Sequence, residues 1–236
     1  MRRLRILTLM LASALSIVVL TRVGTVAARS AAYLPAIDPT QFQATVDHPY
    51  FPLVPGTVYR FSEKAGKRIS DNEVTVTHDT KVIMGVTCVV VHDKLSTRGV
   101  VVEDTYDWYA QDKQGNVWYF GEDSKEFHAK GKVSTEGSWE AGVDGAQPGI
   151  MMKAALAPGE PYRQEYRAGE AEDMGQIVAA GESTTVPFGA FTGCVRIKEW
   201  SQLEAGTSKK WYARGVGCVR SESPGEVSVL IEVTKP

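Results

Sequence analysis

Short runs of β-branched and aromatic residues, separated by turns that contain Gly or Asp, recur along this chain. The runs at 74–77, 88–91, 100–108 and 117–120 are rich in Val, Thr, Tyr and Trp, which are residues that favour strands. The polar segment 112–116 between two aromatic runs is typical of a hairpin loop. No segment shows the sustained apolar period of 3.6 residues that marks an amphipathic helix. We therefore predict an all-β fold with minor α content.

The chain also repeats itself. Three pairs of segments match in the same order: PGTVYR at 55–60 and PGEPYR at 158–163, TCVVV at 87–91 and GCVRI at 193–197, DWYA at 107–110 and KWYA at 210–213. Offsets of 103, 106 and 103 positions indicate a duplicated structural unit. We expect a first β repeat at 49–135, a Gly-rich linker at 136–149 and a second β repeat at 150–236, both repeats forming one domain.

Roughly five strands in each copy predict an antiparallel meander of about 10–11 strands. A sheet of that size curls or closes to protect its edges, so the predicted fold is a barrel or half-barrel. Asp38, Pro39 and Gln41 match an N-cap, a first helical position and a capping box, which predicts a brief helix. Residues 148–157 predict either a helix laid across the sheet or an apolar linker.

Residues 1–28 have the three parts of a secretory signal peptide. A basic start precedes the uncharged apolar run 6–20, and small residues lie before a cleavage position after Ala28. Arg22 ends the apolar run before the roughly 20 residues that a spanning helix needs. We expect a cleaved leader, an N-terminal segment at 29–48, a periplasmic or extracellular location and no stable membrane span after cleavage.

Charge and motifs exclude several classes of function. The chain has 26 basic and 28 acidic residues, and loss of the four leader arginines leaves 22 and 28, a net charge of −6. A nucleic-acid partner is not expected, because such proteins carry a clustered basic surface. The four histidines lack metal-site spacing, and no nucleotide-binding or hydrolase motif is present. We expect no metal, no cofactor and no catalytic residues, while an enzymatic activity stays open.

Three cysteines in an exported chain predict one disulfide and one free thiol. Cys194 and Cys218 lie two strands apart in a meander, roughly 9.6 Å, which exceeds the ~7 Å limit between Cα atoms. Cys88 and Cys194 are equivalent in the two copies, so a pseudo-twofold axis favours a Cys88–Cys194 disulfide. A fully reduced chain is the alternative.

An acidic cluster lies at 103–107. On a strand, Glu103, Thr105 and Asp107 share one face and Asp104 lies on the other. The matching stretch of the second copy is basic, so complementary or solvated surface charge is the simplest interpretation. A hydrolase that uses Glu103, Asp104 and Asp107 is an alternative function, because paired carboxylates can cleave glycosidic bonds.

Aromatic residues provide the candidate ligand site. Core packing explains many of them, but an aromatic-lined cavity for an apolar or sugar-like ligand is the functional interpretation. The candidate ligand-binding residues are Trp108, Trp118, Tyr119, Met151, Met152 and Trp211.

The repeated PG-x-x-YR, CV-x-V or CV-x-I, and WYA motifs resemble uncharacterised exported bacterial β-rich proteins, which are similar to the lipoprotein-carrier-like half-barrels. That resemblance implies about eleven curled strands around an apolar cavity for acyl chains, with a helix as lid. The function expected is an exported, non-enzymatic binding module for an apolar or lipid-like small molecule or a lipidated protein. A structural or envelope-interaction protein without a ligand cavity is the other expectation.

Overall fold

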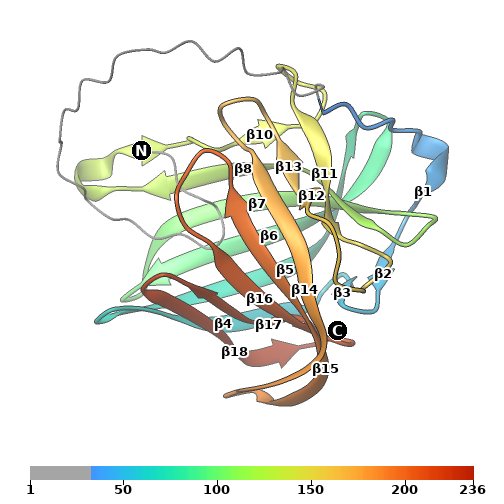
Figure 1. Ribbon diagram of the computed structural model, residues 1–236. Helices are drawn as coiled ribbons and strands as arrows, with labels where there is room; N and C mark the ends of the chain where they lie inside the picture. Colours follow the sequence, from blue (N-terminus) through green and yellow to red (C-terminus); the bar gives the residue numbers. More distant parts are fainter. Residues whose placement is uncertain (1–32) are drawn as a thin grey trace, which may run out of the picture.

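The computed structural model describes residues 33–236, and the predicted signal peptide lies outside them. Within this range the fold is all-β, as the strand-forming runs predicted. Thirteen antiparallel strands form one sheet that nearly closes into a barrel (Figure 1). No helix among these residues is long and apolar enough to cross a membrane.

The sheet follows the chain in two halves. The first half contains β4 (Val58–Ala65), β5 (Arg68–Ile83), β6 (Val86–Thr97), β7 (Val100–Asp112), β8 (Val117–Phe127) and β11 (Gln147–Met152). The second half contains β12 (Tyr162–Arg163), β13 (Glu165–Tyr166), β14 (Asp173–Val186), β15 (Gly189–Ser201), β16 (Ser208–Ala213), β17 (Gly217–Ser223) and β18 (Glu226–Thr234). Shorter elements flank this sheet: η1 (Pro39–Gln41), β1 (Phe42–Gln43), β2 (Val46–His48), β3 (Phe51–Leu53), η2 (Ala129–Gly131), β9 (Val133–Ser134) and β10 (Trp139–Glu140).

The two halves meet on both sides. On one side β18 pairs with β4, with Val229 opposite Ser62. On the other side the segment 162–166 changes partner, because β12 pairs with β14 and β13 pairs with β11. Gln164, between β12 and β13, is buried and its side chain donates to Glu199 Oε1 at 3.0 Å. One short segment thus brings the ends of the sheet together.

The strand ends follow the spacing of the sequence repeat. β5 and β14 end at Ile83 and Val186, and β6 and β15 begin at Val86 and Gly189. Both pairs lie 103 positions apart, which is the offset of two of the matched segments.

The segment between the predicted copies differs from expectation. Residues 148–157 do not form a helix; β11 pairs with β8 instead, with Gly149 opposite Tyr119. The free edge of β8 explains this, because unpaired backbone groups at an edge are satisfied by an added strand. β11 and the two short strands β12 and β13 also raise the strand number above the predicted 10–11.

Two local predictions are confirmed, one of them in part. Asp38 Oδ1 accepts a hydrogen bond from the Thr40 backbone N–H at 2.9 Å and caps η1 as predicted. The predicted helix and its Gln41 capping box are wrong, because η1 is a single 3-10 turn and the Gln41 amide donates to Thr40 Oγ1 instead. The β7–β8 hairpin turns at 113–116, where Asp112 Oδ1 accepts from the Asn116 N–H at 2.8 Å and Gly115 has a φ of 94°. A positive φ at that turn position suits glycine.

Apolar side chains form two clusters, one inside the barrel and one on the outer face of β6–β8. Cys194 belongs to the first cluster and Cys88 to the second. The predicted Cys88–Cys194 disulfide is wrong, since all three cysteines are free thiols. Cys88 and Cys194 lie on β6 and β15, six strands apart in the sheet order, and they pack in different clusters.

Gly121 in β8 provides a test of this packing. Its φ is 128°, and an added Cβ would lie 2.2 Å from the Trp139 carbonyl oxygen of β10. We expect Gly121→Ala to lower the free energy of unfolding by more than about 2 kcal/mol in urea denaturation. Gly181 is the control, because its φ is 84° and nothing lies within 4 Å of its added Cβ. Gly181→Ala should cost only about 1 kcal/mol; equal losses would contradict the close contact.

Candidate functional site

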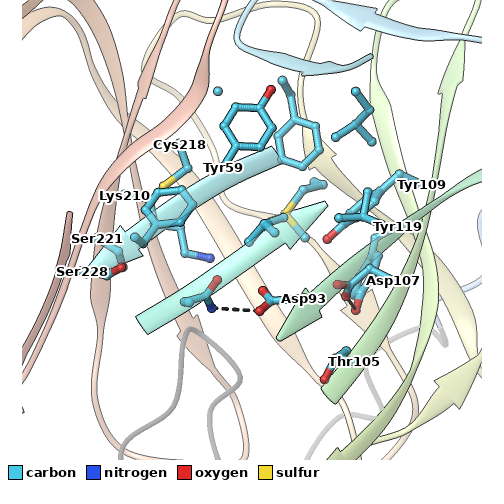
Figure 2. Close-up of a pocket in the computed structure, with 18 of the residues that line it drawn as sticks. Tyr59, Asp93, Thr105, Asp107, Tyr109, Tyr119, Lys210, Cys218, Ser221 and Ser228 are labelled. Atoms are coloured by element: carbon cyan, nitrogen blue, oxygen red, sulfur yellow. Dashed lines mark hydrogen bonds between the residues drawn. The ribbon is translucent and has the colours of Figure 1, made fainter. Parts of the chain in front are cut away.

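A cavity of about 240 Å³ lies inside the barrel. Figure 2 shows Asp107, Tyr109 and Tyr119 on one wall and Lys210 and Cys218 on the facing wall. Strands from both halves of the sheet therefore contribute to one site. The volume lies slightly below the roughly 300–1,000 Å³ of most small-molecule pockets. The cavity suits one small ligand.

The β2–β3 hairpin closes one end of the barrel (Figure 1). The Pro49 carbonyl accepts from the Gly215 N–H at 2.7 Å, at the β16–β17 turn. The Tyr50 hydroxyl donates to the Gly193 carbonyl in β15 at 2.9 Å, and the His48 N–H donates to Gln111 Oε1 in β7 at 2.8 Å. Contacts to two strands, β7 and β15, and to the β16–β17 turn hold this hairpin across the end.

Near the hairpin the cavity is apolar and aromatic. Phe51 of β3 contacts Tyr109 and Tyr212, with ring centroids 5.3 and 6.1 Å apart. Tyr109 in turn stacks on Tyr119 at 4.9 Å. Aromatic faces in such a pocket bind apolar groups of a ligand.

Farther from the hairpin the same inward-facing rows become acidic. Alternate residues of a strand point to one face, so β6 places Val91 and then Asp93 inside, and β4 places Tyr59 and then Glu63 inside. Six carboxyl side chains line the cavity: Glu63, Asp93, Glu103, Asp107, Glu122 and Glu165. Among the described lining residues, Lys210 is the one basic side chain.

Burial raises the pKa of two of these carboxyls, Glu63 and Asp93. Loss of hydration raises the pKa of Glu63 to about 9, and the nearby Asp93, Glu226 and Glu103 carboxyls add to that increase. Loss of hydration also raises the pKa of Asp93 to about 7, with Glu103 adding and a hydrogen bond from Asn72 opposing. Glu63 is therefore protonated at neutral pH in this structure.

The single cation is held by a buried ion pair. Lys210 Nζ lies 2.9 Å from Glu199 Oε2, and the Glu199 side chain is only 2% exposed. Burial alone would lower the pKa of Lys210, but Glu199 and the other negative groups around it together raise it. Lys210 thus stays charged and is bound to Glu199 on the wall of the cavity.

Two of the six residues that the sequence predicts for ligand binding line the cavity, and four do not. Tyr119 and Met151 line the cavity, whereas Trp108, Trp118, Met152 and Trp211 are not among its lining residues. The Trp118 and Trp211 indoles donate to Asp112 and Glu182 at 2.8 and 2.9 Å. The Lys81 Nζ lies 3.3 Å from the Trp108 ring centroid, and Met152 is fully buried.

The side chains of the acidic segment 103–107 alternate between the two faces of β7, as predicted. Glu103, Thr105 and Asp107 line the cavity, while Asp104 Oδ1 lies 2.6 Å from His92 Nε2 on the other face. Glu103 and Asp107 are partly exposed and face the cavity side of β7. The three carboxyls suggested for a hydrolase do not converge on one point.

Sequence analysis missed the four other carboxyls of the cavity and Lys210. A usable signal was present, because β4 and β6 each carry an acidic residue on the same face as their buried apolar residues. No group of three or more His, Cys, Asp or Glu within 33–236 is arranged to hold a metal ion.

No protein-family model matches this chain, and the curated protein sequences contain no similar one. Among solved structures it is similar to a candidate exported protein with a YmcC-like fold from Bacteroides fragilis, with 17% identity and a TM-score of 0.47 over 79% of this chain and 99% of that one. A candidate lipoprotein from Parabacteroides distasonis has 14% identity and a TM-score of 0.43 over 78% and 98% of the two chains.

Proposed function

We propose that this protein is an exported, non-enzymatic binding protein that holds one small, partly apolar molecule inside its barrel. The cavity behind the β2–β3 hairpin carries this proposal, because its aromatic half is suited to an apolar group and is left unfilled by side chains. The predicted leader supports export. A purely structural protein of this size needs no such cavity, since protein interiors are close-packed.

The volume of the site limits the ligand. About 240 Å³ lies below the volume of most small-molecule pockets. A single short apolar chain or ring fits this space better than a lipid with two long acyl chains. The proposal is therefore a carrier or sensor of a small amphiphile.

Binding of the neutral dye N-phenyl-1-naphthylamine tests the proposal. We expect a saturable rise in dye fluorescence with one dye per chain. Val74 lines the cavity, so Val74→Phe should weaken binding by about tenfold or more by filling it. Val82 on the same strand is 65% exposed, and Val82→Phe should bind the dye like the wild type. The proposal fails if binding does not saturate, or if Val74→Phe binds as tightly as Val82→Phe.

A further inference from the structure

Three turns at one end of the barrel, which we call the basic turns, carry exposed positive charge. These segments, 64–69, 97–100 and 127–133, contain no Asp or Glu and six Lys or Arg residues, all of them exposed: Lys64, Lys67, Arg68, Arg98, Lys130 and Lys132. The exposed carboxyls that follow two of these segments, Asp71 and Glu136, do not offset six cations. The whole chain has 26 basic and 28 acidic residues, so its net charge conceals this cluster.

Strand pairing brings the basic turns together. The first two connect β4 to β5 and β6 to β7, and the third joins β8 to β9, which pairs with it. Ser70 of β5 lies opposite Thr97 of β6, so the first two turns lie side by side. β7 begins at Val100 in the second turn, and its far end at Gln111 binds the β2–β3 hairpin. The basic turns therefore form one surface at the end of the barrel opposite that hairpin (Figure 1).

Large apolar side chains are exposed in the same turns. Val100 is 65% and Ile69 is 59% exposed. Phe127 and Val133 are also exposed and lie directly opposite each other across β8 and β9. Each basic turn thus presents both apolar and cationic side chains. This combination is typical of protein surfaces that lie in the interface of an anionic bilayer.

Two of the cations occupy backbone positions that turn chemistry does not favour. Arg98 and Lys130 have φ values of 54° and 64°, in the left-handed region where Gly and Asn are preferred. Arg98 precedes Gly99 in a two-residue hairpin turn, whose usual first residue is Asn, Asp or Gly. The two cations therefore suit a contact outside the turns better than the turns themselves.

We propose that the basic turns dock this protein on an anionic phospholipid bilayer, with Ile69, Val100 and Phe127 at the level of the headgroups and the cations among the lipid phosphates. The predicted leader supports export to a compartment that a bilayer borders. An acidic protein or a nucleic acid would also attract the cations, but neither accounts for large apolar side chains in each of three separate turns. This inference does not depend on the cavity or on its ligand.

Co-sedimentation with vesicles tests the docking. The leader-free chain, purified after export, is mixed with vesicles of phosphatidylcholine alone or of equal parts phosphatidylcholine and phosphatidylglycerol. We expect binding to the anionic vesicles to be about tenfold or more tighter, and most of that difference to disappear in about 1 M salt. The proposal is overturned by equal binding to the two vesicle types or by binding to neither. Tighter binding to a short DNA duplex than to the anionic vesicles also overturns it.

Charge variants at the two ends of the barrel locate the contact. Lys67→Gln with Arg98→Gln removes two cations from the basic turns and should weaken binding to anionic vesicles by about tenfold. The matched control is Lys113→Gln with Lys235→Gln, because both lysines are exposed and lie at the other end, in the β7–β8 turn and after β18. This control should bind like the wild type. Equal weakening in both double variants would show that net charge and not the basic turns determines binding.

Apolar variants separate insertion from electrostatic attraction. Ile69→Ser with Val100→Ser keeps every charge and should weaken binding to anionic vesicles by about tenfold, because two apolar side chains no longer leave water. Val54→Ser with Val82→Ser is the control, since these two valines are 51% and 65% exposed and lie outside the basic turns. All four side chains are exposed, so both variants should fold. The insertion is wrong if the two double variants bind the anionic vesicles equally tightly.

Discussion

Replacement of Lys210 by Met is expected to lower the free energy of unfolding by about 3–5 kcal/mol at pH 7.5. Lys210 Nζ lies 2.9 Å from Glu199, whose side chain is 2% exposed. Removal of the lysine leaves a buried carboxylate without its cation, and such a loss costs more than the intact pair contributes. Gln164 still donates to Glu199 at 3.0 Å, but an amide supplies no charge. Equilibrium denaturation in urea measures the difference.

Two further variants show whether the lost ion pair is the cause. Lys209 is the exposed neighbour of Lys210, so Lys209→Met should change stability by less than about 0.5 kcal/mol. The double variant Lys210→Met with Glu199→Gln removes both charges and keeps an acceptor for Gln164, so it should recover most of the loss. Equal losses in Lys210→Met and Lys209→Met would show that the pair does not stabilise the barrel.

The local part of this fold could be predicted from the sequence because it depends on neighbouring residues. Alternation at 103–107 correctly gave the two faces of β7, and Asp38 and the 112–116 loop gave a cap and a hairpin. Closure of the barrel could not be predicted in the same way. It depends on the pairing of β18 with β4 and on the change of partner at Gln164, contacts between residues far apart in sequence.

The site was harder to predict because its interior is polar on one side. A period of two separates the faces of a strand but does not say which face is inside. Acidic residues are mostly exposed in proteins, so Glu103 and Asp107 were interpreted as surface charge. Large aromatic residues are mostly buried, so they were assigned to the cavity. Trp108 instead packs in the cluster outside β6–β8.

Two acidic side chains of the cavity link stability to pH. Glu63 and Asp93 both line the cavity, and the Asp93 carboxyl adds to the raised pKa of Glu63. Burial disfavours the charged form of both carboxyls. Carboxyls with raised pKa values are common at functional sites. The protein should therefore lose stability as Glu63 and Asp93 ionise.

The Glu63→Gln variant is expected to remove much of that pH dependence. Burial raises the pKa of Glu63 to about 9, from an ordinary value of 4.5 for glutamate. The folded state then binds a proton that the unfolded state has lost, so this residue destabilises the wild type progressively as the pH rises from 4.5 towards 9. Between pH 5 and pH 8 the effect is roughly 4 kcal/mol at 1.36 kcal/mol per pH unit. Gln cannot ionise, so the variant should gain stability over the wild type by about that amount across this interval.

Urea denaturation at pH 5, 6, 7 and 8 measures both curves. Asp93, with a pKa of about 7, destabilises both proteins in the lower part of the range, and its effect cancels in the difference between them. Glu160 is exposed, so Glu160→Gln should follow the wild-type curve. Parallel curves for the wild type and Glu63→Gln would mean that Glu63 ionises in the folded state as readily as in the unfolded one. A diverging pair would instead show that burial keeps Glu63 a neutral acid in the folded protein.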